Sequence, residues 1–117
     1  MSTNSQIAFT PLGQTIVVAS TTSAPTGIQA PVYSKFDAQN AGQFRFINNS
    51  TVTVFLGTGS TAAEATANAV APTAGSPTAA IVLVPGAVEI LRFNNSTYFS
   101  GLSTSAATVY ITPGQGL

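Results

Sequence analysis

The sequence predicts an all-β domain, and three observations support this class. Short β-branched and aromatic runs alternate with period two at intervals along the chain. Clusters of Gly, Pro, Asn and Ser separate these runs. The 117 residues are 44% hydrophobic, enough for one domain with a buried core. We predict a single antiparallel, jelly-roll-like β-sandwich with about six to eight short strands and little helix.

Residues 43–57 carry the strongest strand signal. Phe44 and Phe46 alternate with polar residues before the Asn-Asn-Ser cluster at 48–50, and the same alternation continues after it through Val54. Because Asn tolerates positive φ and its amide can bond the local backbone, this cluster is typical of a turn. We predict a β-hairpin here, with one apolar face toward the core.

Further strands are predicted at residues 14–20, 28–33, 81–84, 87–93, 98–102 and 107–112. Pro31 cannot donate to a ladder, which makes 28–33 an edge strand. Pro85 and Gly86 together predict a type II turn. In the last strand, Val109 and Ile111 should face one way and Tyr110 the other.

A near repeat links two of the predicted turns. RFINNST at 45–51 and RFNNST at 92–97 differ by one inserted residue and otherwise match. An internal duplication would explain this, but two similar turns after Phe-bearing strands are the simpler account.

The predicted domain covers residues 14–112, with an N-terminal arm at 1–13 and a C-terminal tail at 113–117. Within it, residues 57–78 are rich in Ala, Thr and Gly and are the ambiguous segment. Thr61 and Glu64 fit a capping box, which would start one short helix. A long loop is an equal alternative. A loop of this length is often functional, so the segment is a candidate contact surface.

Charged side chains make up 5% of the chain and sum to zero net charge, against about a quarter of residues in an ordinary soluble domain. They are Lys35, Asp37, Arg45, Glu64, Glu89 and Arg92. Three scattered cations form no patch that could neutralise phosphates, so no nucleic-acid partner is expected. Because a neutral, weakly charged surface tends to associate, this surface is typical of one that a partner covers.

Residues that carry chemistry are scarce. The chain has no Cys and no His, which removes thiolate nucleophiles, imidazole bases and the commonest zinc ligands. The carboxylates show no spacing typical of an acid–base pair and are few for a calcium site. We therefore expect no enzymatic activity and no cofactor or metal.

No apolar run approaches the roughly 20 residues that a transmembrane helix needs. The first six residues are polar and lack the basic start and apolar core of a signal peptide. We expect a protein made in the cytoplasm of its host cell, with no membrane partner.

Three segments in residues 43–117 carry a family resemblance: FINNSTVTVFLGTGS at 46–60, LVPGAVEILRF at 83–93 and the ending TVYITPGQGL at 108–117. In this order and spacing they resemble small virion proteins of tailed bacteriophages. The resemblance implies a jelly-roll head protein of the cement or decoration type. Such a protein binds the outside of the capsid and clamps neighbouring major capsid subunits. Its partners would be the major capsid protein and further copies of itself, as dimers or trimers, on the capsid surface.

Two alternatives stay open. A tail, fibre or head-fibre-base module of the virion would use the same strand-rich sandwich. A carbohydrate-binding module is a third possibility, although such modules usually expose Trp and this chain has none.

Three regions are predicted to contact the partner: the arm, the segment 57–78 and the tail. Aromatic residues are favoured at interfaces, although a half-buried strand position is the alternative interpretation for each tyrosine. The candidate contact residues are Phe9, Leu12, Tyr33, Tyr98, Tyr110, Pro113 and Leu117.

Overall fold

The computed structural model describes residues 9–11, 13–29, 42–94 and 96–115. These residues form one helix, α2 (Ala62–Asn68), and the strands β1 (Thr10–Pro11), β2 (Ile16–Ser20), β3 (Ile28–Gln29), β4 (Gln43–Asn48), β5 (Val54–Gly59), β6 (Ile81–Leu83), β7 (Val88–Arg92), β8 (Tyr98–Ser103) and β9 (Ala107–Gln115).

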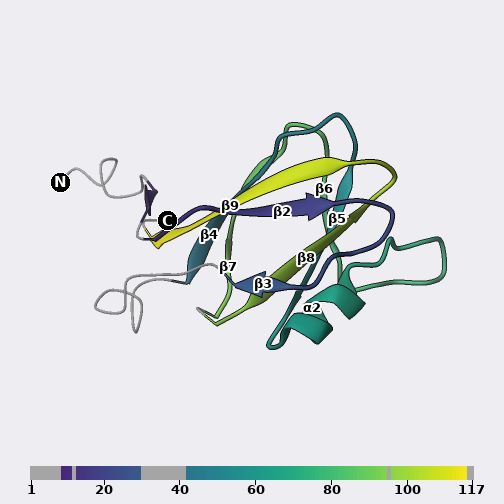
Figure 1. The fold of residues 1–117 in the computed structure, drawn as a ribbon, viewed down its shortest axis with the longest axis horizontal. Coiled ribbons are helices and arrows are strands. Elements are labelled where there is room, and N and C mark those ends of the chain that lie inside the picture. The colour runs from purple at the N-terminus through teal and green to yellow at the C-terminus, as the bar shows by residue number, and fades with distance from the viewer. Residues whose placement is uncertain (1–8, 12, 30–41, 95, 116–117) are drawn as a thin grey trace.

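The strands build two antiparallel sheets packed face to face (Figure 1). One sheet has the order β2-β9-β4-β7, with the short β1 pairing beside β2 along the same edge of β9. The other has the order β3-β8-β5-β6. The pairs are nested, because β2 pairs β9, β3 pairs β8, β4 pairs β7 and β5 pairs β6. This nesting is the strand order of a jelly roll, so the predicted fold class is confirmed.

The predicted hairpin over residues 43–57 is wrong. β4 and β5 both form, but they lie in different sheets, and residues 49–53 carry the chain from one sheet to the other. The edges of β4 are taken by β9 and β7, and those of β5 by β8 and β6. Alternation predicts a strand and its buried face, but it does not identify the neighbouring strand.

The side chain of Asn48 stabilises this crossing. It is fully buried. Its Nδ2 lies 2.9 Å from the carbonyl oxygen of Val52, 2.8 Å from that of Leu83 and 3.1 Å from that of Val84. Its Oδ1 accepts a hydrogen bond from the Ser50 hydroxyl. One amide therefore ties the β4–β5 crossing to the end of β6.

The predicted type II turn at Pro85 and Gly86 is confirmed. Gly86 has φ +77°, and the Ala87 N–H donates to the Val84 carbonyl at 2.9 Å. This turn also crosses between sheets, since it joins β6 to β7.

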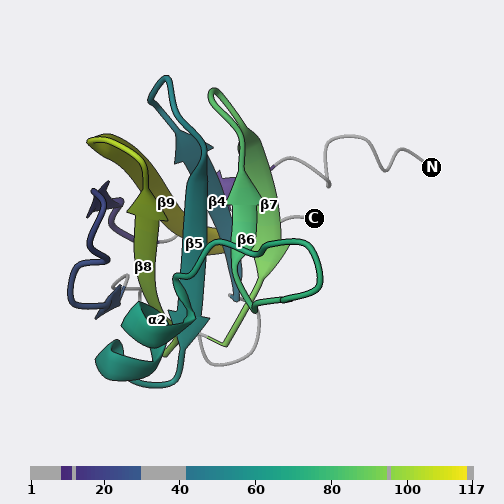
Figure 2. The same cartoon turned by 90° about the vertical axis from the view of Figure 1, so that its right-hand side faces the viewer.

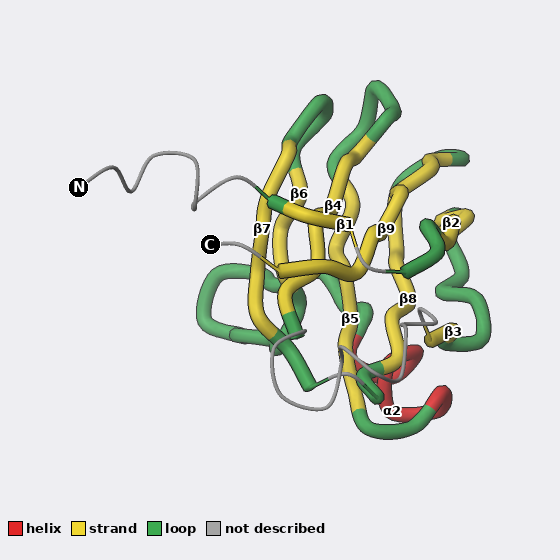
Figure 3. The backbone as a smooth tube through the Cα atoms, turned by 90° about the vertical axis from the view of Figure 1, so that its left-hand side faces the viewer, coloured by secondary structure: helices red, strands yellow, loops and turns green. Residues whose placement is uncertain are grey.

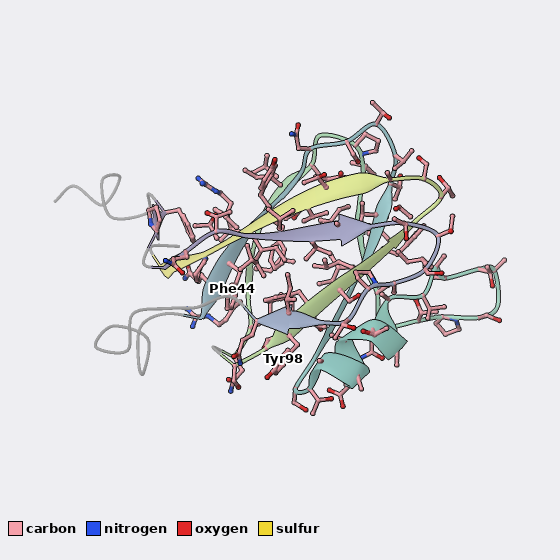
Figure 4. The ribbon with its side chains drawn as sticks, in the orientation of Figure 1. Phe44 and Tyr98 are labelled. Atoms are coloured by element: carbon pink, nitrogen blue, oxygen red, sulfur yellow. The ribbon has the colours of Figure 1, made fainter. Side chains whose placement is uncertain are left out.

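Four phenylalanines fill the space between the sheets. All pairs among Phe44, Phe46, Phe93 and Phe99 have ring centroids 5.2 to 6.5 Å apart, and Figure 4 marks Phe44 in this cluster. Most of these pairs are edge-on, a favoured arrangement for aromatic rings. Aliphatic side chains from both sheets surround the rings, namely Val18, Val54, Leu56, Leu83, Val109 and Ile111. Val109 and Ile111 share one face of β9, as predicted, and this face is buried.

In the ambiguous segment at 57–78 the short-helix alternative is the correct one up to Asn68, since the segment contains the end of β5 and helix α2. The Thr61 half of the capping box is confirmed, because the Thr61 hydroxyl accepts from the Glu64 N–H at 3.1 Å; the Glu64 carboxylate reaches one residue further and accepts from the Ser60 N–H at 2.8 Å. In Figure 2 the helix lies across the ends of β5 and β8. Gly57 permits this contact, because a Cβ there would collide with the Ala65 carbonyl oxygen. The irregular part of the segment therefore starts only after α2.

The tail predicted at 113–117 is shorter than expected, because β9 runs on to Gln115. Pro113 is buried and lies opposite Phe44 in the sheet. β1 and β2 pair with β9 on either side of Pro113, so its missing N–H interrupts neither short ladder. Figure 3 shows β1 beside this end of β9.

Candidate functional site

A row of apolar side chains crosses the outer face of the sheet β2-β9-β4-β7. The register places Val17 beside Tyr110, Tyr110 beside Ile47, and Ile47 beside Val88. Their sequence neighbours on these strands, such as Phe46 and Val109, point into the core, so these four point away from it. We call this surface the Tyr110 face.

The two ends of this row are open to solvent. Val17 is 48% exposed and Val88 is 60% exposed, while Tyr110 and Ile47 between them are half-buried. Single exposed apolar residues are ordinary on a protein surface, but a row that spans four strands is a feature of contact surfaces.

Two arginines lie on the same face, next to the apolar row. Arg45 stands opposite Thr112 on one side and Ile90 on the other, and Arg92 stands opposite Gln43. Arg45 and Arg92 are therefore diagonal neighbours across β4 and β7.

The Arg45 side chain is partly enclosed. Its guanidinium carbon lies 5.4 Å from the centre of the Phe9 ring, which is within cation–π range. Its Nε is buried and has no hydrogen-bond partner in the described part of the chain. The contact also places Phe9, and with it the described end of the N-terminal arm, on the Tyr110 face.

The outer face of the other sheet is different. Leu102, Phe55 and Val82 form a shorter apolar row across β8, β5 and β6. Further along β5, Gly57 and Gly59 lie beneath α2. We call this surface the Phe55 face; the helix covers part of it, and its apolar row is one strand narrower than that of the Tyr110 face.

The predicted contact residues are distributed over different parts of the fold. Phe9 and Tyr110 come together on the Tyr110 face. Tyr98 lies on β8 in the other sheet, between Gln29 and Gly59 (Figure 4). Pro113 is buried in the core and offers no surface to a partner. Leu12, Tyr33 and Leu117 lie outside the described residues.

Sequence reasoning missed Val17, Ile47, Val88, Arg45 and Arg92 as surface partners of Tyr110. Strand alternation already indicated that each points away from its apolar neighbours. Their assembly into one surface depends on the register between strands that are far apart in the sequence, and no local pattern encodes that register.

A small apolar cavity of about 170 Å³ lies between the edges of β2 and β3. It is lined by Val17, Val18, Ala19, Pro25, Thr26, Ile28 and Phe99. This volume is below the roughly 300–1,000 Å³ of ordinary small-molecule sites. Its lining also offers no ionisable side chain to orient a ligand. Among the described residues, no cluster of three or more His, Cys, Asp or Glu side chains is placed to bind a metal ion.

No protein-family model, curated protein or solved structure matches this chain at a significant level. In the described part of the chain, no helix has the length and apolar character needed to cross a membrane. The fold itself defines the class of protein, a jelly-roll β-sandwich with a short surface helix.

Proposed function

We propose that this chain is a structural virion protein that binds the outside of a tailed-phage capsid and stabilises it as a cement or decoration protein. The observation that carries the proposal is the Tyr110 face, an apolar row across four strands in a chain with only six charged residues. Such a surface binds through apolar and backbone contacts and does not need dense charge.

The fold supports the same class by analogy, because jelly rolls occur in viral capsid proteins, in lectins and in cupins. Within this fold class, the sequence favours a virion protein. The resemblance to small phage virion proteins lies in the segments at 46–60, 83–93 and 108–117.

The proposed mechanism is linkage between binding and shell stability. A protein that binds the assembled shell and not its separated subunits stabilises the shell by RT ln(1 + [L]/Kd) at each site. At a free concentration of 100 times Kd this amounts to about 2.7 kcal/mol per site. Because the shell repeats each site many times, the contributions add without any covalent step.

The test is co-sedimentation with expanded, emptied heads of the phage that encodes the chain. We expect binding to saturate at a fixed ratio to the major capsid protein and to raise the melting temperature of the shell. Purified tails serve as the parallel sample, since binding to tails alone would replace this proposal with the tail or fibre alternative. Saturable binding to a sugar panel would instead support the carbohydrate-binding alternative.

A further inference from the structure

The few charges of this protein are distributed unevenly over its surface. Of the four charged residues that the structure describes, Arg45 and Arg92 both lie on the Tyr110 face. Glu89 pairs with the inward-facing Phe46 and so points to the opposite side of β7. Glu64 caps α2, which packs on the other sheet. Among the described residues, the Tyr110 face carries cations and no carboxylate.

The surroundings of the Arg45 side chain favour an anionic partner. Arg45 lies in the row next to Tyr110 and Ile47, against the Phe9 ring, and its buried Nε has no hydrogen-bond partner among the described residues. A cation in partly apolar surroundings is solvated less well than one in water. A carboxylate brought to this face would be attracted to the guanidinium as a whole, and this attraction would be stronger where water is excluded.

A symmetric contact between the Tyr110 faces of two copies is disfavoured. Two Tyr110 faces brought together would place Arg45 and Arg92 of one copy against the same cations of the other. Like charges juxtaposed in an interface oppose binding. The face is complementary to a partner of the opposite sign.

We propose that the Tyr110 face is the surface that docks on the shell, and that the shell presents there an apolar patch with at least one carboxylate, from Asp or Glu, to Arg45 and Arg92. This inference rests on the proposed function and adds the orientation of the protein and the chemistry of its partner. The Phe55 face, with α2, then points away from the docked surface.

The test uses the same co-sedimentation assay with a change of sign at one position. Val88→Lys and Val88→Asp both remove the 60%-exposed valine at the end of the row, but they add opposite charges. With an acidic partner, Val88→Asp should raise Kd at least tenfold relative to Val88→Lys. Arg92→Gln should also raise Kd about tenfold, and it should reduce the salt dependence of binding.

Val82→Asp is the matched control. Val82 is a 49%-exposed valine on an edge strand of the other sheet, so the substitution makes the same chemical change on the Phe55 face. We expect it to alter Kd less than twofold. Urea unfolding of each variant verifies that the fold is intact.

The outcomes separate the two proposals. If the wild-type protein binds heads but Val82→Asp releases it and Val88→Asp does not, the Tyr110 face is the wrong surface, while the cement function survives. Equal losses for Val88→Lys and Val88→Asp, or tighter binding by Val88→Asp, would overturn the acidic partner. If the wild-type protein does not bind heads, both proposals fail.

Discussion

Asn48→Ala should be among the most destabilising single substitutions outside the phenylalanine cluster. The Asn48 amide has two hydrogens, so at most two of its three carbonyl contacts, to Val52, Leu83 and Val84, are full hydrogen bonds. Losing a bond to a buried acceptor costs about 1–2 kcal/mol. Two such losses predict a decrease of about 3 kcal/mol in the free energy of unfolding, which corresponds to roughly 12 °C in Tm for a chain of this size.

Urea unfolding followed by circular dichroism measures this change, and Asn49→Ala is the matched control. Asn49 is the next residue in the chain, but its side chain is exposed, so its removal should change stability by less than about 0.5 kcal/mol. If the two alanine variants were equally stable, the assigned role of Asn48 at the crossing would be refuted.

Asn48→Asp extends the test to pH. The introduced carboxylate would face carbonyl oxygens in a buried site, which raises its pKa in the folded state. Stability would therefore be greatest at low pH, where the carboxyl is protonated and can donate, and would fall as pH rises through the folded-state pKa. Wild-type protein measured over the same pH range is the reference.

Three further predictions concern close packing and capping. Gly57→Ala should lower stability by at least about 2 kcal/mol and reduce the helical circular dichroism signal, because the added Cβ meets the backbone of α2; Gly75→Ala, where space is open but φ is +80°, should cost only about 1 kcal/mol. Ser20→Ala should leave stability unchanged or raise it by about 1 kcal/mol in urea unfolding, because the buried Ser20 hydroxyl has no hydrogen-bond partner among the described residues; a loss of more than about 1 kcal/mol would show that the hydroxyl does have a partner. Thr61→Ala removes the hydrogen-bond acceptor at the start of α2 and should lower the free energy of unfolding by about 1 kcal/mol in the same urea measurement. Thr61→Ser keeps the hydroxyl and should therefore keep most of this stability.

The sequence was sufficient to predict β2 to β9, but it missed the short β1, which falls within the predicted N-terminal arm, and it did not identify which strands pair. The residues predicted to share one face of a strand, Phe44 with Phe46 and Val109 with Ile111, are all buried, because alternation along one strand reports its own two faces. The neighbour of a strand is decided by contacts between distant segments, as where β4 lies between β7 and β9. The hairpin prediction failed at this step, since it assumed that the nearest strand in sequence is also the neighbour in space.

The near repeat at 45–51 and 92–97 shows which structural features the local sequence determines. In each copy a Ser hydroxyl donates to the Oδ1 of the Asn two residues before it, in the pairs Ser50–Asn48 and Ser96–Asn94. In each copy the chain also passes from one sheet to the other, from β4 to β5 and from β7 to β8. The shared residues therefore specify a similar crossing, which agrees with the interpretation as two similar turns and leaves the question of duplication untested.

The two copies differ in what their asparagines do. Asn48 is buried and bonds the end of β6, whereas Asn94 is exposed and its Oδ1 accepts from the backbone N–H and hydroxyl of nearby Ser96. The same local motif thus connects distant strands at Asn48 but forms a surface turn at Asn94. The Tyr110 face likewise depends on which distant strands are brought together. Each of its side chains is an ordinary outward strand position, and only the nested pairing of β2, β9, β4 and β7 gathers them with two arginines into one apolar, cationic surface.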